Sequence, residues 1–457
     1  MVPLTRVIGE FVAGMRFDAI PDAAIAIARN GFTDYAGTTI LGRTTPVVKV
    51  LKSVCSVAAQ GGEARVCFGA EGARTVDAAL INGTSGHALD YDDIGIGAHP
   101  AHPSVAMAPA IFAEAEVLGA TGRDMLTAYM TGYEVWGEIA RRDRQQHSVK
   151  GWHATGTFGA IAAAAAVSKL RGLDARKASH AIGLAASQAC GLVGNFGSMA
   201  KPFHAGNAAR IGVLSARLAE SGMTAAPDII EKAGGFLHAV SPAGEVDCDS
   251  PEIFGREWWM LRHGLGFKLY PVCYGAHRSL AGMLELIAEH PFSADEVKEV
   301  HVVMGRGQMA SLVNHDPKNG LDAKFSEEFV MAMAIMARRA SLAEVADEFV
   351  ARPDVRALMS KVRITTVDEV DPEHRTSPVN DRVSVLLKDG RTLERRFGHP
   401  RGHPARPIGR DDLWAKFSDC TSAAMAPPRA RLLFDQLQAL ESVQCIAELP
   451  LTDGDEH

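Results

Sequence analysis

The sequence lacks several features that would place it in a specialised class of protein. Its seven cysteines are widely spaced and form no Cys-x-x-Cys motif, which argues against a disulfide framework and against a cysteine zinc site. Aromatic residues make up only 6% of the chain, whereas alanine and glycine are abundant, and this disfavours an all-β sandwich. The longest bland apolar run, 160–167, is far shorter than the roughly 18 residues that a membrane span requires. These absences favour a reduced, cytoplasmic protein built from closely packed helices.

Charge of one sign is not concentrated anywhere in the chain. The 47 basic and 54 acidic residues give a net charge of -7 and are spread along the sequence. A nucleic-acid-binding domain would instead show a basic patch or stripe. The first fifteen residues include Arg6 and Glu10, so they lack the uninterrupted apolar core of a signal peptide. We therefore expect no nucleic-acid partner and no association with a membrane.

Hydrophobic spacing predicts two kinds of structure along the chain. Apolar residues recur at i, i+3 and i+4 through most of the first 240 residues, most clearly in 106–118, 125–140, 157–170 and 175–186. Beyond residue 266, alternation of apolar and polar residues predicts strands at 297–303, 361–366, 382–387 and 392–397. Asp389-Gly390 between the last two predicts a hairpin. Helices are expected within this region at 276–290 and 326–349 and after it at 410–445.

This order of elements predicts a mainly α protein with a large discontinuous helical domain and a smaller α+β lid domain. The lid would comprise residues 266–404. The helical domain would comprise residues 1–265 and, after the Pro- and Gly-rich segment 398–404, residues 405–457. A site between two such parts would be covered by the lid.

The loop that follows residue 87 is rich in groups that can carry charge. Asp90, Asp92, Asp93, His99 and His102 fall within 13 residues of a Gly- and Pro-containing segment. Such a cluster is costly to assemble unless the charges are used, so we expect a functional site. A simpler interpretation makes two of the carboxylates helix-end residues. A metal site is the sharper alternative, but His-Pro-Ala-His lies in a loop and not on one face of a helix.

Two further segments combine glycine with basic side chains. His153 and Thr155 precede the Ala-rich helical stretch, where a helix N-terminus could hold a carboxylate, although a threonine there could also be a plain helix cap. A Gly-rich approach leads to Lys201-Pro and His204, which resembles an anion cradle with a point charge. It lacks the P-loop signature, so a nucleotide phosphate is not the expected ligand.

A fourth segment, 268–278, lies where the lid is expected to begin. Lys268, Tyr270, His277 and Arg278 together offer carboxylate clamps and a proton donor. Cys273 lies among them, but no cysteine-enzyme signature surrounds it, so we do not expect a nucleophile there.

Taken together, these four segments resemble the MmgE/PrpD family. The matching motifs occur in the family's order across nearly the whole chain: His87-Ala-Leu-Asp90-Tyr-Asp-Asp with His99-Pro-x-His102-Pro-Ser, Gly151-Trp-His153-x-Thr, Gly197-Ser-Met-x-Lys201-Pro-x-His204-x-Gly, and Lys268-x-Tyr-Pro-x-Cys-x-x-x-His277. The resemblance implies a helical domain with a lid, a homodimer, and activity with no metal and no organic cofactor. Known members dehydrate 2-methylcitrate, decarboxylate cis-aconitate or epimerise iminodisuccinate, so it implies a small di- or tricarboxylate substrate.

The resemblance also assigns roles to residues of this sequence. Carried over position by position, the catalytic residues are Asp90, His102, His153, Lys201 and His277. The remaining polar residues of the four segments are expected to bind substrate, namely Asp93, His99, Thr155, His204, Lys268, Tyr270 and Arg278. Each reaction of the family needs a base at a carbon flanked by carboxylates and groups that hold those carboxylates.

Departures from the family pattern bear on the reaction. Decarboxylase-like members carry a site tyrosine after an Ala-Lys-Phe-Ser segment, whereas Phe329 stands at that place here, after 323–326. The segment 270–277 looks more like the epimerase branch than the methylcitrate dehydratases. A 2-methylcitrate dehydratase-like hydro-lyase is our leading expectation. The alternatives are an epimerase or isomerase of an iminodisuccinate-like dicarboxylate, a cis-aconitate-type decarboxylase and a non-catalytic carboxylate-binding protein.

Overall fold

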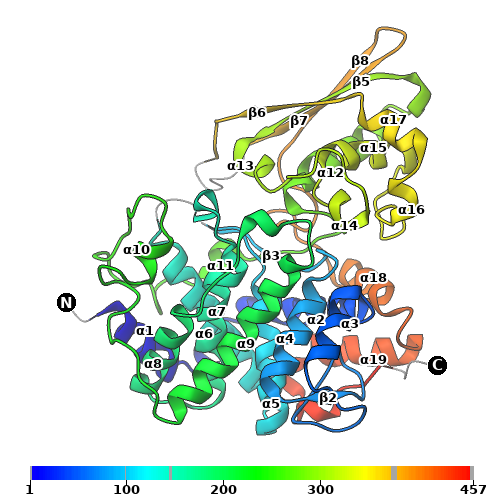
Figure 1. The fold of residues 1–457 in the computed structure, drawn as a ribbon. Coiled ribbons are helices and arrows are strands. Elements are labelled where there is room, and N and C mark those ends of the chain that lie inside the picture. The colour runs from blue at the N-terminus through cyan, green and yellow to red at the C-terminus, as the bar shows by residue number, and fades with distance from the viewer. Residues whose placement is uncertain (1–2, 98, 144–146, 372–377, 453–457) are drawn as a thin grey trace.

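A computed structural model describes residues 3–97, 99–143, 147–371 and 378–452. Figure 1 shows a large helical body with a smaller part above it that contains the main sheet. The predicted fold class, mainly α with a smaller α+β part, is confirmed. No helix among the described residues is both long enough and apolar enough to cross a membrane.

The helical body is built around long helices that pack side by side. Its elements up to the lid are α1 Leu4–Gly14, α2 Asp22–Gly42, α3 Pro46–Val54, β1 Ala64–Arg65, β2 Gly72–Ala73, α4 Thr75–His87, β3 Ile94–Gly95, α5 Pro103–Leu118, α6 Gly122–Ala140, α7 Ala154–Leu170, α8 Ala175–Ala186, α9 Ala200–Glu220, α10 Phe236–Val240, α11 Trp259–His263 and β4 Leu265–Gly266. The Ala-rich stretch 160–166 of α7 is completely buried, and α7 packs against α5, α6, α8 and α9. Small side chains let these helices approach closely, as the composition indicated.

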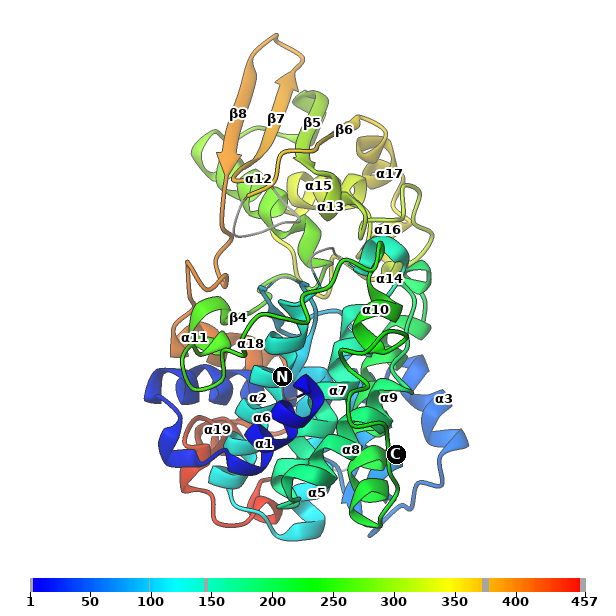
Figure 2. The same ribbon diagram turned by 90° about the vertical axis from the view of Figure 1, so that its left-hand side faces the viewer.

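The chain returns to this body at its C-terminal end. The last helices are α18 Arg410–Thr421 and α19 Pro427–Gln438, and both pack against α2. In Figure 2 these late helices lie beside the N-terminal ones. Leu413, Phe417 and Leu433 are buried in the same core as residues of α1 and α2. The body is therefore discontinuous in sequence.

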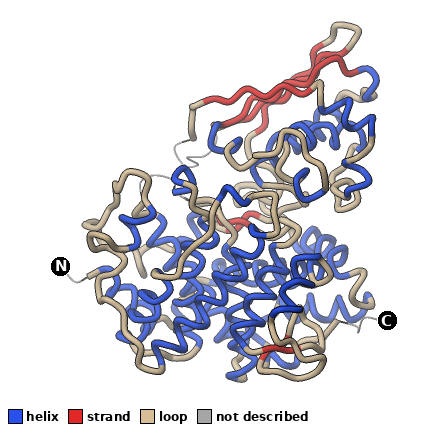
Figure 3. Tube along the Cα trace, in the orientation of Figure 1, coloured by secondary structure: helices blue, strands red, loops and turns tan. Residues whose placement is uncertain are grey.

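The upper part has its own sheet and core. Its elements are α12 His277–Glu289, β5 Val297–Gly305, α13 Arg306–Met309, α14 Gly320–Ala323, α15 Glu327–Ala337, α16 Asp347–Val350, α17 Pro353–Met359, β6 Val362–Val367, β7 Asp381–Leu387 and β8 Thr392–Phe397. The strand order is β6-β5-β7-β8, with β5 and β6 parallel and the other pairs antiparallel. Figure 3 shows this sheet outermost, with helices between it and the helical body.

Alternating burial along β7 explains how the lid packs. Val383, Val385 and Leu387 are buried while the residues between them are partly exposed, and α12 and α15 contact the sheet. A separate hydrophobic core runs from Val272 to Leu387 and does not include the body residues. We keep the boundaries at residues 266 and 405 as a prediction for where the two domains divide.

Two predicted helices differ from the structure. The helix expected over 326–349 ends at Ala337, because Arg338 adopts a left-handed conformation (φ 57°) and donates to the Phe292 carbonyl oxygen. Only α16 follows before residue 350. The stretch expected over 410–445 is divided into α18 and α19, since Pro427 and Pro428 fit the first turn of a new helix but not the interior of an old one. The predicted hairpin at Asp389-Gly390 is confirmed.

Candidate active site

A cavity of about 240 Å³ lies between the helical body and the lid. Its walls come from the loop after β3, the start of α7, the start of α9, the start of α12 and the segment 399–403 that leads back from the lid. Five residues expected at the site line this cavity: His99, His102, His153, Lys201 and Arg278. Tertiary folding thus brings together groups from all four segments singled out in the sequence.

Asp90 lies just behind the cavity and anchors two lysines. It follows α4 with a positive φ of 52°, a conformation that costs a non-glycine residue free energy. Its Oδ1 accepts from the Lys201 ammonium at 2.6 Å and from the Lys268 ammonium at 2.9 Å. Burial alone would raise the pKa of Asp90, but these two cations outweigh it and hold the pKa well below its usual value. The Asp90 carboxylate is therefore ionised.

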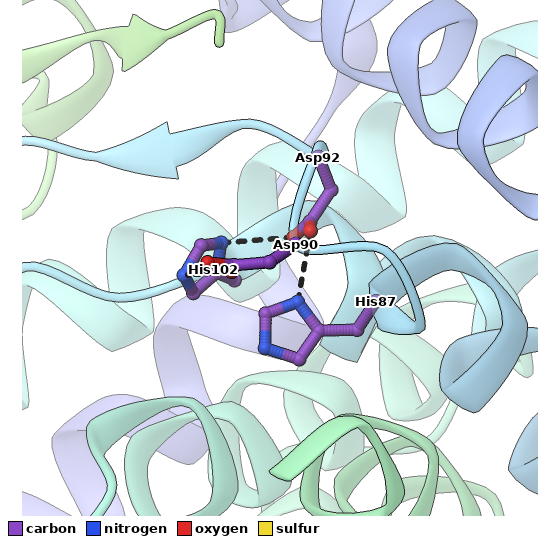
Figure 4. A group of neighbouring side chains, drawn as sticks. All are labelled: His87, Asp90, Asp92 and His102. Carbon is purple, nitrogen blue, oxygen red and sulfur yellow. Dashed lines mark hydrogen bonds and ion pairs between the residues drawn. The ribbon is translucent and has the colours of Figure 1, made fainter. Parts of the chain in front are cut away.

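His102 is held so that one ring nitrogen is available for chemistry. It is the residue before α5, and its Nδ1 lies 2.8 Å from both the Asp93 carbonyl oxygen and Asp92 Oδ2. Because two acceptors surround Nδ1, that nitrogen carries the proton and Nε2 has the free lone pair. Nε2 lies 3.9 Å from Asp90 Oδ1. Figure 4 shows these groups gathered around one loop.

Asp92 joins His102 to a second imidazole. Its Oδ1 contacts His87 Nδ1 at 2.8 Å, and both the carboxylate and His87 are fully buried (Figure 4). Burial opposes ionisation of Asp92, but the two imidazoles outweigh it and keep its pKa well below normal. Burial lowers the pKa of His102, and Asp92 only partly offsets this. His102 is therefore neutral near pH 7, as a general base must be.

A second pair of histidines lies at the start of α7. His153 is the residue before the helix, and its Nδ1 lies 3.1 Å from Nδ1 of His204 on α9. Burial, followed by the nearby Lys201 charge, lowers the pKa of His153 well below normal and that of His204 to about 4. Both rings are neutral, so one of the two nitrogens donates to the other. His153 can then offer its other ring nitrogen to a ligand in the cavity.

Lys201 is the cationic group of the cavity wall. It is the second residue of α9, and its side chain is nearly buried. The ammonium lies 5.0 Å from the ring centroid of Phe196 and 4.6 Å from that of Phe325. These contacts and the Asp90 ion pair fix one position for the charge. A substrate carboxylate that enters the cavity meets the charge there.

The expected catalytic residue His277 and two expected substrate ligands, Thr155 and Asp93, are directed into internal contacts. His277 Nε2 donates to the Val272 carbonyl oxygen at 3.2 Å, and burial lowers the His277 pKa to about 3. The Thr155 hydroxyl accepts from the His102 backbone N–H at 3.1 Å. Asp93 accepts from the Ser104 hydroxyl, and burial and then Asp34 raise the pKa of Asp93 well above normal. These three lie next to the site but do not line the cavity.

Three other expected ligands of the substrate have partners elsewhere in the protein. The Arg278 guanidinium donates to the carbonyl oxygens of Gly398, Pro378 and Val379, so it ties the start of α12 to the segments that flank β7 and β8, although it lines the cavity. The Lys268 ammonium donates to the Asp90 carboxylate and to its backbone carbonyl. Tyr270 packs beside the His277 ring and likewise does not line the cavity. Their assignment as substrate ligands stays a prediction.

Sequence reasoning missed some residues that the structure places at the site. Asp92 was recognised as part of the cluster but was not chosen, and His87 and Lys324 were overlooked. The Lys324 ammonium donates to the Leu89 carbonyl oxygen, and burial lowers the Lys324 pKa to about 7.

Other missed residues belong to the cavity wall itself. Three of them are aromatic residues inside the segments already singled out, and two belong to the segment 398–404 that was expected to be a plain connection, namely Trp152, Phe196, Tyr274, His399 and His403. The last two rings stack at 4.1 Å. The repeated Gly-His-Pro at 398–400 and 402–404 was the available signal for them.

Two groups of side chains among the described residues have the composition of a metal site. His87, Asp90, Asp92 and His102 form the first, but Lys201 and Lys268 already neutralise Asp90, and Asp92 already bridges two imidazoles. A metal ion there would have to compete with these partners.

The second group is His99, Asp143 and His147, all buried. Asp143 Oδ2 lies 3.8 Å from His99 Nε2 and 4.0 Å from His147 Nδ1. Ligand atoms about 2.0–2.2 Å from a tetrahedral zinc ion lie roughly 3.3–3.6 Å from one another, so these separations would have to contract by only a few tenths of an ångström. Our expectation of a metal-independent site stays a prediction.

Comparison with known proteins connects this geometry to a family. The model of the MmgE/PrpD N-terminal domain matches residues 6–249, and that of the MmgE/PrpD C-terminal domain matches residues 270–440. Together the two models cover most of the chain and both sides of the cavity.

Curated relatives match over nearly their full length. The human cis-aconitate decarboxylase is 27% identical over 457 aligned positions, which cover 96% of this chain and 92% of that protein. The mouse cis-aconitate decarboxylase is 25% identical, with 96% and 91% covered. That of Aspergillus terreus is 24% identical, with 98% and 95% covered.

Proposed function

Because the chain belongs to the MmgE/PrpD family, we propose that it is a lyase that moves a proton at a carbon next to a carboxylate of a small carboxylic acid. The observation that carries this proposal is the arrangement of His102. Its neutral imidazole lines an enclosed cavity, its Nδ1 is held by two acceptors, and the Lys201–Asp90 ion pair lies beside its Nε2.

The proposed roles follow from charge. His102 Nε2 accepts a proton from the substrate carbon, and Asp92 stabilises the imidazolium that forms. The electron pair left on the substrate spreads into the adjacent carboxylate, where negative charge grows. Lys201 and a ring N–H of His153 hold that carboxylate in a site shielded from water, where such contacts are strongest. Asp90 fixes the Lys201 ammonium in place.

The bond that breaks next distinguishes the members of this class. If hydroxide leaves the neighbouring carbon, the reaction is a dehydration, which the sequence motifs favour. In support, Phe329 is fully buried in the lid core and contacts Phe349, so it offers no hydroxyl to the cavity. If a carboxylate leaves as carbon dioxide instead, its bonding electron pair stays on the substrate, and a substrate carbon takes up a proton where the dehydration removes one. That reaction is the decarboxylation named for the curated relatives. The His102 imidazole would then act in its protonated form, as the proton donor.

Proton NMR in deuterated water tests this proposal. The enzyme is incubated with citrate-, aconitate-, malate- and aspartate-like acids, and α-deuterium, alkene signals and released carbon dioxide are measured. We expect one of the acids to exchange or react with the wild-type chain and not with His102→Asn. Exchange with inversion and no bond cleavage would indicate the epimerase alternative. Binding of an acid without any exchange or reaction would contradict the proposal and favour a carboxylate-binding protein.

A further inference from the structure

The walls of the cavity are far less charged than a tricarboxylate would require. Among the described residues that line it, Lys201 and Arg278 are the only lysine and arginine, and none is Asp or Glu. Lys201 is already paired with Asp90 at 2.6 Å. The Arg278 guanidinium donates to three carbonyl oxygens, and its Nη1 lies 3.6 Å from Asp381 Oδ1. The cavity therefore offers little positive charge beyond what internal partners already use.

The inner end of the cavity nevertheless suits one or two carboxylates. His102, His153 and Lys201 are all more than nine-tenths buried and meet there. Neutral imidazoles and one ammonium can together donate hydrogen bonds to a few carboxylate oxygens. Three carboxylates would bring three negative charges into a nearly buried space, and a buried charge without a partner is costly.

Much of the remaining lining is apolar, interrupted by polar side chains such as His99, Gln308 and His403, and its apolar residues become more exposed toward the mouth. Ile94 and Ile96 are 5% and 6% exposed, whereas Val149 is 81% exposed. Trp152 and Val193 lie between these extremes. Trp152 pairs with Leu192 through a β-bridge, which holds the two sides of this outer wall together.

Burial decreases along this apolar wall from Ile94 and Ile96, which are as buried as the charged groups, to Val149. We propose that the substrate has at most two carboxylates, held at the inner end, and an apolar arm that lies along this outer wall. The inference rests on the proposed function, since it names the substrate of the same site. Each methylene of the arm that leaves water should tighten binding by about fourfold until the wall is covered.

Calorimetry with a graded series of ligands tests this inference. The series consists of 2-alkylsuccinic acids with progressively longer alkyl arms, and cis-aconitate is the tricarboxylate comparator. We expect Kd to fall by about fourfold per methylene and the longest fitting arm to bind more tightly than cis-aconitate. A Kd that is flat along the series, or tightest binding by cis-aconitate, would overturn the inference.

Variants at the mouth sharpen the test. Val149→Lys adds a cation at a mostly exposed position, so it should flatten the alkyl series and tighten cis-aconitate. Val193→Lys, at a partly buried position of the same wall, should do the same. Leu432→Lys is the control, because Leu432 is 52% exposed on α19 and does not line the cavity. If the mouth variants leave the series unchanged, the arm does not bind at this wall.

Deuterium exchange on the tightest-binding acid separates the two proposals. A clear preference for alkyl arms without α-proton exchange would leave the binding inference standing and contradict the proposed lyase function. Exchange on several acids without any preference for an alkyl arm would contradict the binding inference and leave the proposed lyase function standing.

Discussion

At the scale of single residues, the site depends on which group holds each proton. Asp92 is acceptor to two imidazoles, so it selects the tautomer of His102 that exposes a bare Nε2 to the cavity. Burial lowers the pKa of that ring and keeps it neutral, while Lys201 and Lys268 keep Asp90 ionised and the two imidazoles keep Asp92 ionised. None of these properties belongs to a residue type alone. Each results from a neighbour supplied by another part of the chain.

Replacing His102 by Asn should lower kcat by roughly 10²–10⁴-fold, with a smaller effect on KM, because the base is lost while the carboxylate holders remain. Steady-state kinetics on the acid found by NMR measure this, with circular dichroism to verify folding. His290→Asn is the matched control, since His290 is exposed at the end of α12. A folded His102 variant with full activity would exclude this base.

The same histidine sets the acid side of the pH profile. Its folded pKa lies below the ordinary 6.5, so the base is protonated only when the pH falls through that lower value. Activity should therefore persist below pH 6.5 and decline further down, giving one limb of a bell-shaped kcat/KM profile. An acid limb centred above 6.5 would show that another group is titrating.

Replacing Lys201 by Ala should raise KM and lower kcat together, because this ammonium meets the substrate carboxylate and also its developing charge. Lys201→Arg should restore little. The ammonium is enclosed by two aromatic rings and Asp90, a position that a larger planar guanidinium does not fit. Near wild-type kinetics for either variant would contradict the role of Lys201 as an anion holder.

At the scale of elements, close helix packing places the two halves of the site. Helix α4 leads to Asp90, and α9 carries Lys201 and His204. The two helices touch where Gly206 faces the backbone of α4. A Cβ at Gly206 would lie 2.1 Å from the Leu80 carbonyl oxygen. The distance between Lys201 and Asp90 thus depends on a glycine several residues away.

Gly206→Ala should destabilise the protein by roughly 1–3 kcal/mol, since neither backbone can move aside without disturbing other contacts. Chemical unfolding measures the change. Gly14→Ala on α1 is the control, because no atom lies within 4 Å of its added Cβ, and it should change stability by less than about 0.5 kcal/mol. Equal stability of the two variants would show that α4 and α9 can move apart enough to accommodate the added methyl group.

The lid contains a buried carboxyl whose titration should affect stability. Burial raises the pKa of Glu327 on α15 to about 8 from 4.5, and Asp381 nearby adds to the effect. Between pH 4.5 and about pH 8, the Glu327 carboxyl keeps its proton in the folded protein, whereas the unfolded chain releases it. The stabilisation is complete below pH 4.5 and is lost as the pH rises through 8.

Glu327→Gln should therefore abolish part of the pH dependence and stabilise the protein at pH 8 relative to the wild type. The expected gain is on the order of 1–3 kcal/mol, or a few degrees in Tm. Thermal unfolding at pH 5 and pH 8 measures it, with Glu328→Gln, which lies next to it but is not buried, as control. If the wild type instead had the higher Tm at pH 8, Glu327 would not be a buried acid with a raised pKa.

At the scale of the whole molecule, the helical body supplies the proposed proton-transfer and anion-holding groups His102, His153 and Lys201, while the lid supplies another part of the cavity wall. We expect activity to survive EDTA and the purified protein to contain no stoichiometric zinc, iron or magnesium, because lysines and imidazoles already satisfy the buried carboxylates of the first acidic group. Elemental analysis and chelation followed by assay test this. One metal per chain, with activity lost on its removal, would contradict the metal-independent mechanism. His99, Asp143 and His147 would then be the candidate ligands.

The homodimer and the cytoplasmic location remain predictions.

The class of fold, the family and five residues of the cavity wall could be predicted from the sequence alone. Helical and strand periodicity record which faces are buried, and this explains why the helices around α7 and the strands of the lid were predicted well. The division of 326–349 was not predicted, because the helix ends at a left-handed Arg338 whose guanidinium donates to the carbonyl oxygen of Phe292, a residue far away in the sequence.

The partners and protonation states of the charged groups could be assigned only from the folded structure. Asp92 and Asp93 are neighbours in sequence, yet one bridges two imidazoles and the other is buried against a serine with a raised pKa. Arg278 resembles a substrate clamp in the sequence but binds lid carbonyl oxygens in the fold. The physical reason is that protonation and hydrogen bonding depend on distance and burial, which are set by segments far apart in the chain.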